Sequence, residues 1–96
     1  MKVIILFTMK GCPHCTDLKE LFQNNELEFI DRDIFEYADE YEEFVSAKKN
    51  EFVPAMIFMT LDKSGENYSD VKLLAPDDDY QDITEAFNLA NSYVSE

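Results

Sequence analysis

The sequence predicts an α/β domain in which a four-stranded mixed sheet is flanked by three helices, with the element order βαβαββα. An unbroken apolar run near the N-terminus is typical of a strand that is buried on both faces. Helical periodicity follows it, and later two β patterns enclose a turn-rich segment, which is typical of a hairpin. Because 96 residues can bury only one sizeable core, residues 1–96 are expected to form a single domain.

The first part of the chain predicts two parallel strands joined by a helix. Lys2–Thr8 is rich in β-branched and large apolar residues, so we expect it to form the central strand. From Pro13 to about Asn25, apolar residues recur at helical spacing, namely Cys15, Leu18, Leu21 and Phe22. Leu27–Asp33 alternates in polarity and is expected to form the second strand, which a crossover helix makes parallel to the first.

The middle of the chain predicts a surface helix followed by a hairpin. Tyr and other apolar residues repeat at i, i+4, i+7 and i+8 within a charged stretch, the pattern of an amphipathic helix: Tyr37, Tyr41, Phe44 and Val45. Ala55–Leu61 and Val71–Leu74 have β character, and Asp62–Asn67 between them is rich in turn residues. We therefore expect an antiparallel pair here.

The end of the chain predicts a third helix that begins near Asp78. Asp78 is a candidate N-cap, with Gln81 three residues later to complete the cap. The apolar stripe of this helix is expected to contain Tyr80, Ile83, Phe87, Ala90 and Val94.

The charge balance is strongly acidic and excludes several kinds of partner. Twenty-one Asp and Glu residues against 8 Lys and Arg residues give a formal charge of −13, which repels phosphate backbones and anionic lipids. We therefore expect neither nucleic acid nor a membrane as a partner. The acidity either serves solubility alone or complements a basic docking surface on a partner protein.

The N-terminal segment lacks the pattern of an export signal. Met1–Phe7 contains one cation and a short apolar run, without the long apolar region and small-residue cleavage site of a signal peptide. We expect a cytoplasmic protein. In a reducing compartment, two closely spaced cysteines are more often catalytic or metal-binding than a structural crosslink.

Cys12-Pro13-His14-Cys15 is the motif that carries chemistry. A CxxC at the start of a helix places two sulfurs within disulfide reach, and the helix N-terminus stabilises a thiolate on the first cysteine. Cys12 is therefore the candidate nucleophile, and Cys15, one turn further into the helix, is the candidate resolving cysteine. Lys10 and His14 are candidates for tuning the thiolate, although His14 also fits an ordinary exposed residue.

Two other interpretations of the cysteines have less support. A zinc site needs four ligands, whereas the chain has two Cys and one His, and the His lies between the cysteines. We therefore expect no metal site. Two inert buried cysteines are the other alternative, which a CxxC beside a strand–helix–strand pattern disfavours.

Val53-Pro54 is the second notable feature, because proline just before an apolar strand removes a backbone donor. A cis bond in a tight turn would explain it, but most X-Pro bonds are trans, so the residues alone leave the isomer open.

Taken together, these motifs resemble those of a dithiol glutaredoxin of the thioredoxin superfamily. The likeness spans the chain: an opening strand, Lys10 two residues before Cys-Pro-x-Cys, a mid-chain Val-Pro before a strand, and an Asp pair near the last helix. It implies a thioredoxin-like fold and a cis Pro54, with the Val53 backbone pairing to the substrate as an added strand. It also implies that Lys10 receives a glutathione carboxylate and that Asp77 and Asp78 hold the γ-glutamyl end, although Asp78 also fits a plain N-cap.

The chain departs from the usual glutaredoxin pattern at four places. Ala75-Pro76 replaces the Gly-Gly before the Asp pair, Phe52 replaces a common Thr, and Asp62–Asp70 is longer than the usual tight turn. His14 stands where Tyr is common, and Cys-Pro-His-Cys is also typical of strongly oxidising periplasmic thiol oxidases.

The resemblance implies a thiol–disulfide oxidoreductase that reduces protein disulfides or glutathionylated thiols, with glutathione as co-substrate and no tightly bound cofactor. A ribonucleotide reductase is one partner by family analogy, and a monomer is the default. The main alternative is a thioredoxin-like donor reduced by a thioredoxin-type reductase. A non-catalytic iron–sulfur carrier is a further alternative, but such relatives usually have a single-cysteine site.

Overall fold

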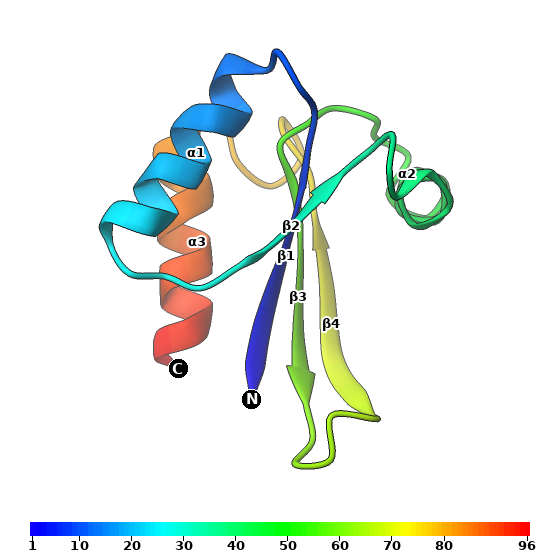
Figure 1. Cartoon of the computed structure of the whole chain (residues 1–96), viewed down its shortest axis with the longest axis vertical. Coiled ribbons are helices and arrows are strands. Elements are labelled where there is room, and N and C mark those ends of the chain that lie inside the picture. The colour runs from blue at the N-terminus through cyan, green and yellow to red at the C-terminus, as the bar shows by residue number, and fades with distance from the viewer.

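The computed structural model describes residues 1–96 as a sheet in the order β2-β1-β3-β4, with helices on both faces (Figure 1). The strands and helices are β1 (Lys2–Thr8), α1 (Pro13–Asn24), β2 (Ile30–Asp33), α2 (Ala38–Lys48), β3 (Ala55–Leu61), β4 (Tyr68–Leu74) and α3 (Ile83–Ser95). β1 pairs with β2 in parallel, whereas the β1–β3 and β3–β4 pairs are antiparallel. The predicted element order, mixed sheet and thioredoxin-like arrangement are therefore confirmed. No helix combines the length and the apolar character needed to cross a bilayer.

The sheet is buried on both faces, as the apolar run of β1 predicts. Ile4 and Leu6 pack with α1 and α3 in the larger core cluster, whereas Phe7 packs with Phe44 of α2 on the opposite face. Figure 1 shows the same division, with α1 and α3 together on one side of the sheet and α2 on the other. Successive β1 residues thus fill two cores, which fixes β1 near the middle of the sheet.

β2 begins later than the sequence predicts, at Ile30 instead of Leu27. The backbone before Ile30 is used to close the end of α1. Glu26 adopts a left-handed conformation with φ 56°, and the Leu27 N–H donates to the Phe22 carbonyl over 2.8 Å. This is the usual cap of a helix C-terminus, and residues in it cannot also join the sheet.

β4 begins earlier than predicted, at Tyr68 instead of Val71. The first residues of β4 are exposed, so they carry no apolar alternation that would mark them as a strand. The pairing also shifts register between Phe58 and Thr60, and Asp70 has φ 53°. The hairpin itself and its turn are where the sequence predicts them.

α3 begins at Ile83, so the prediction that Asp78 caps it is wrong. Asp82 is the N-cap, and its carboxylate accepts a hydrogen bond from the Glu85 N–H over 2.9 Å. Asp77 has φ 72°, a conformation that no right-handed helix contains. The helix therefore uses an N-cap four residues after the predicted one.

The later start also changes the buried stripe of α3. Ala86, Ala90 and Tyr93 are buried, whereas Val94, expected in the stripe, is 40% exposed. Tyr80 is buried as expected but lies outside the helix, at the end of the segment that follows β4. Residues 75–79 form a turn closed by the Asp79 N–H, which donates to the Ala75 carbonyl.

Candidate active site

The two cysteines lie where β1 passes through a short turn into α1. Gly11 occupies this turn with φ 79°, a conformation that is easy only for glycine. Cys12 is the N-cap of α1 and Pro13 follows at the start of the helix. Cys12 and Cys15 are joined by a disulfide, so the predicted position of the pair is confirmed.

The start of α1 directs hydrogen-bond donors toward Cys12. The Cys15 N–H donates to the Cys12 sulfur over 3.2 Å, and the Thr16 N–H donates to the Cys12 carbonyl over 3.1 Å. The first N–H groups of a helix have no acceptor within the helix, and the positive end of the helix dipole lies there. A thiolate on Cys12 therefore has a donor in place when the disulfide is reduced.

The two sulfur-bearing residues differ in access. Cys12 is 9% exposed, whereas Cys15 is 1% exposed. A substrate sulfur therefore reaches Cys12 more readily than Cys15. This difference supports the predicted roles of nucleophile and resolving cysteine.

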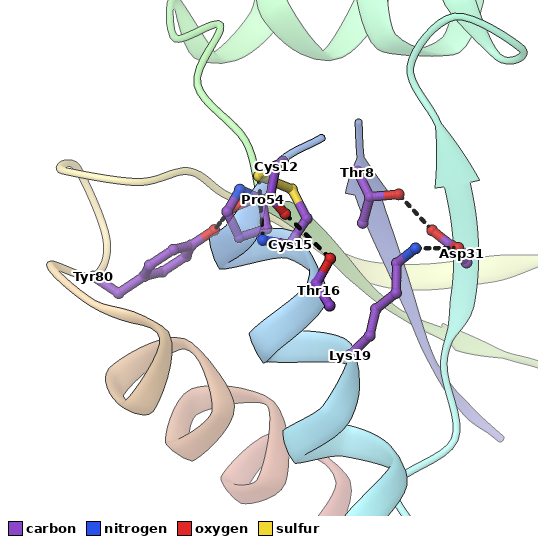
Figure 2. Close-up of a disulfide and its surroundings, with 8 residues drawn as sticks. All are labelled: Thr8, Cys12, Cys15, Thr16, Lys19, Asp31, Pro54 and Tyr80. Carbon is purple, nitrogen blue, oxygen red and sulfur yellow. Dashed lines mark hydrogen bonds and ion pairs between the residues drawn. A yellow bond between two sulfur atoms is a disulfide. The ribbon is translucent and has the colours of Figure 1, made fainter. Parts of the chain in front are cut away.

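Pro54 lies beside the disulfide (Figure 2), and its peptide bond with Val53 is cis. The pairing of Phe7 with Ala55 brings this proline to the end of β1, from which the chain continues to Cys12. Tyr80 donates a hydrogen bond to the Pro54 carbonyl. Burial, together with the charge of neighbouring Asp79, raises the pKa of Tyr80, so its hydroxyl keeps its proton at neutral pH.

The backbone of Val53 is free to bind a partner. Val53 precedes β3, and neither its N–H nor its carbonyl forms a hydrogen bond within the chain. An extended peptide can pair with such an unpaired backbone as an added strand. The structure thus leaves the predicted recognition edge open beside the disulfide.

Asn50 fixes the loop that carries this edge. Its side-chain amide donates to the Pro76 carbonyl over 2.8 Å and to the Asp78 carboxylate over 3.1 Å. Its side-chain oxygen accepts from the Phe52 N–H over 2.9 Å. Asn50 therefore connects the α2–β3 loop to the β4–α3 loop.

A groove of about 470 Å³ lies between the start of α1 and these two loops. We call it the Val53 groove. Its lining residues are His14, Asp17, Phe52, Val53, Pro54, Pro76, Asp77, Tyr80, Gln81, Asp82 and Ile83. Of the predicted site residues, His14, Val53, Pro54 and Asp77 line this groove.

Lys10 and Asp78, also predicted as site residues, lie elsewhere. Lys10 lines a separate cavity of about 410 Å³ that also contacts Cys15. Asp78 is exposed, is bonded by Asn50 and does not line the Val53 groove. The expected position of the Asp pair at the helix N-terminus is therefore wrong, because Asp82 occupies it.

The cavity that Lys10 lines contains a polar network that sequence reasoning did not foresee. Thr8, only 2% exposed, donates to Asp31 over 2.6 Å, and Lys19 forms an ion pair with Asp31 over 2.8 Å. Figure 2 shows these side chains between α1 and β2. No group of three or more His, Cys, Asp or Glu side chains here or elsewhere could hold a metal ion.

Several residues that line or support the groove were not predicted as site residues, among them Asp17, Asn50, Tyr80 and Asp82. Asp82 had a detectable signal, because Asp82 and Glu85 form a capping pattern. Asn50 and Tyr80 had none, since their partners lie 26 residues away in the chain.

Comparison with known proteins identifies a family. Residues 4–58, more than half of the chain, match the family model described as Glutaredoxin. The matched segment includes both cysteines and Val53-Pro54. None of the curated proteins gives a significant match.

Proposed function

Since this chain belongs to the glutaredoxin family of thiol–disulfide oxidoreductases, we propose that it reduces protein disulfides and glutathione mixed disulfides with glutathione as co-substrate. The observation that carries the proposal is the Cys12–Cys15 disulfide at the start of α1, beside the unpaired Val53 backbone. We further propose that it acts as a cytoplasmic monomer without nucleic acid, membrane or tightly bound cofactor. A ribonucleotide reductase is one acceptor by analogy.

Reduction of a substrate begins at Cys12. Its thiolate attacks one sulfur of the substrate disulfide, and the other substrate sulfur leaves as a thiolate that takes up a proton. The product is a mixed disulfide between Cys12 and the substrate. Cys15, deprotonated, then attacks the Cys12 sulfur, releases the second substrate thiol and closes the Cys12–Cys15 disulfide seen in this structure.

Glutathione restores the dithiol in two exchanges. One glutathione thiolate attacks the Cys12 sulfur and releases Cys15 as a thiol, which leaves glutathione bound to Cys12. A second glutathione thiolate attacks the bound glutathione sulfur, so oxidised glutathione leaves and Cys12 returns as a thiolate. Two electrons pass from two glutathiones to one disulfide in each cycle.

The proposed glutathione contacts lie on both sides of the disulfide. Asp77 in the Val53 groove accepts the γ-glutamyl ammonium, and Lys10 from the neighbouring cavity receives a carboxylate. Asp78 is proposed for the same end of glutathione but must compete with its bond to Asn50. His14, which lines the groove beside the cysteines, is proposed to tune the Cys12 thiolate together with Lys10.

A coupled assay tests the electron donor. The protein is given a small mixed disulfide with glutathione, glutathione reductase and NADPH, and in parallel with a thioredoxin-type reductase and NADPH. Turnover in the first assay supports the proposal. Turnover in the second alone would replace glutathione by a reductase and withdraw the contacts assigned to Lys10, Asp77 and Asp78.

One observation favours that second donor. Ala75-Pro76 stands where glycines would allow glutathione to approach the backbone closely, and the Asp79 carboxylate bonds the Ala75 N–H over 2.8 Å. That N–H is therefore not available to a small ligand.

A further inference from the structure

We propose that the Val53 groove selects polypeptide disulfides that carry Lys or Arg next to the reactive cysteine. This inference rests on the proposed function, because it names the substrate class of the same site. It is based on three observations: carboxylates line the groove, two of them have no hydrogen-bond or ion-pair partner, and apolar side chains lie beside them.

Three carboxylates line the groove: Asp17, Asp77 and Asp82. One oxygen of Asp82 accepts the Glu85 N–H, as a helix N-cap does. The side chains of Asp17 and Asp77 take part in no hydrogen bond or ion pair within the chain. The negative charge of the groove is therefore not neutralised by the protein itself.

The basic residues of the chain lie elsewhere. None of the 8 Lys and Arg residues lines the groove, and His14 is its one basic side chain. Four of the cations form ion pairs at other places: Lys2 with Glu96, Lys19 with Asp31, Arg32 with Glu40 and Lys48 with Asp79. A cation from a substrate is thus the available partner for the groove carboxylates.

Apolar surface accompanies this charge. Phe52 lines the groove and is 58% exposed, and Ile83 lines it from the start of α3. Lys and Arg have an apolar stem and a cationic head, so one side chain of this kind matches both features. The face of an aromatic ring such as Phe52 also attracts a cation.

Pairing with the Val53 backbone would orient a peptide substrate along the groove. A peptide that pairs with Val53 lies along the groove while its cysteine meets Cys12, so the residues beside that cysteine pass close to the carboxylates. The carboxylates of glutathione outnumber its ammonium, so glutathione gains less from this groove than a basic peptide does.

Three peptides test the inference in the wild-type protein. They share one sequence with a single cysteine in mixed disulfide with a small thiol, and the residues next to the cysteine are Lys, Gln or Glu. We expect kcat/KM at low salt to fall from Lys through Gln to Glu, with roughly a tenfold difference between Lys and Glu. The difference should shrink at high salt, because salt screens exposed charges.

A variant without the groove charges tests whether the preference for Lys peptides arises in the groove. Asp17→Asn, Asp77→Asn and Asp82→Asn are combined, because Asn tolerates the left-handed backbone at Asp77 and still caps α3 at Asp82. The preference for Lys should be lost in this variant.

The matched control removes the same amount of charge away from the groove. It combines Glu42→Gln, Glu43→Gln and Asp70→Asn, whose residues are exposed and of which Asp70 is also left-handed. The control should keep the Lys preference. Equal loss in both variants would mean a general charge effect and would overturn the proposal.

The remaining outcomes separate this inference from the proposed function. Equal kcat/KM for the three peptides in the wild-type protein overturns the substrate preference and leaves the proposed function standing. Failure to reduce any of them, with any donor, contradicts the proposed function itself.

Discussion

Cys12 and Cys15 are three residues apart, yet the fold gives them different access to solvent, and their variants should differ accordingly. Cys12→Ser should reduce all activity to the uncatalysed background, because the proposed nucleophile, the more accessible of the two cysteines, is lost. Cys15→Ser should keep glutathione-dependent removal of glutathione from a thiol but lose reduction of protein disulfides, because no second thiol releases the substrate. Coupled assays with one substrate of each kind measure both.

The wild-type protein at equal concentration is the control for this pair of variants. Full reduction of a protein disulfide by Cys12→Ser would reverse the assigned roles of the two cysteines.

Tyr80 has a single polar task, which is to donate to the Pro54 carbonyl. Tyr80→Phe leaves a buried carbonyl without a donor, so we expect the free energy of unfolding to fall by about 1–3 kcal/mol. Urea unfolding measures it. Tyr68→Phe is the control, because Tyr68 is 64% exposed and its hydroxyl has no partner, so its change should stay within about 0.5 kcal/mol.

The pH dependence of this contribution follows from the raised pKa of Tyr80. A tyrosine whose folded-state pKa exceeds its unfolded value of 10.0 contributes its full stability below that pH. The contribution is lost as pH rises above it toward the folded-state pKa. Above pH 10 the free energy of unfolding should therefore fall more in the wild type than in Tyr80→Phe. An equal fall in both proteins would contradict the assigned role of the Tyr80 hydroxyl.

At the scale of single residues, the sequence predicted the reactive residues better than the residues that hold the site in shape. Cys12 and Cys15 could be found because a motif and a helix start coincide in the sequence. Tyr80 was predicted to be buried, but its bond to Pro54 depends on where the β4–α3 segment lies in space. Such a contact between distant residues has no local pattern.

Among the elements, the β3–β4 hairpin depends on one carboxylate in its turn. The Asp62 carboxylate accepts hydrogen bonds from the Ser64 hydroxyl, the Asn67 amide and the Gly65 N–H. These bonds, that of Ser64 foremost, lower the pKa of Asp62 from 3.8 to about 2. The turn is therefore stabilised above the unfolded pKa, and this stabilisation should be lost as pH falls from 3.8 toward about 2.

Hydrogen exchange or the NMR shift of the Gly65 amide, followed between about pH 4 and pH 2, measures this loss. In Asp62→Asn, whose side chain does not titrate, the same amide should not change over this range. An identical pH response in that variant would exclude Asp62 as the cause.

The start of α3 gives a second prediction for an element. Asp82→Ala removes the N-cap and should lower the free energy of unfolding by about 1 kcal/mol. Asp78→Ala, the matched control, loses only an exposed bond to Asn50 and should cost less than half as much. A larger loss in Asp78→Ala, measured by urea unfolding, would contradict the observed helix start.

Element boundaries were predicted well where apolar patterns ended sharply and poorly where they did not. β1 and β3 have the predicted limits because their apolar runs end at turn residues. β4 has an exposed first half, and α3 follows two competing caps, so local pattern could not decide either start.

For the whole molecule, the charge of −13 is the property with the widest reach. At about 0.01 M salt the screening length is about 30 Å, which is comparable to the 36 × 30 × 23 Å extents of the molecule, so carboxylates across most of the molecule repel one another. At about 0.15 M the screening length is about 8 Å. We expect the urea midpoint of unfolding to rise between these concentrations, because the compact state suffers most from self-repulsion.

A midpoint that falls or stays constant would show that local ion pairs outweigh this repulsion. Neutral sucrose at matched osmolality in the low-salt buffer is the control for effects that do not depend on charge.

The overall topology was predictable because apolar patterning and connection order together allow few arrangements. A buried first strand followed by a crossover helix requires a parallel neighbour, and a later hairpin must join the other side. The contact between the α2–β3 loop and the β4–α3 loop was not predictable. The bonds of Asn50 and Tyr80 that join these loops connect residues far apart in the sequence.

The hydrogen bonds of Asn50 and Tyr80 that join these loops also affect the rate and the heat capacity of substrate binding. Asn50 and Tyr80 hold the Val53 edge in shape before a substrate arrives. A preorganised edge spares the complex the entropy of ordering a loop, so little folding is coupled to association. The heat-capacity change on binding should then reflect only the surface that substrate and groove cover, and encounter, rather than loop rearrangement, should limit the association rate.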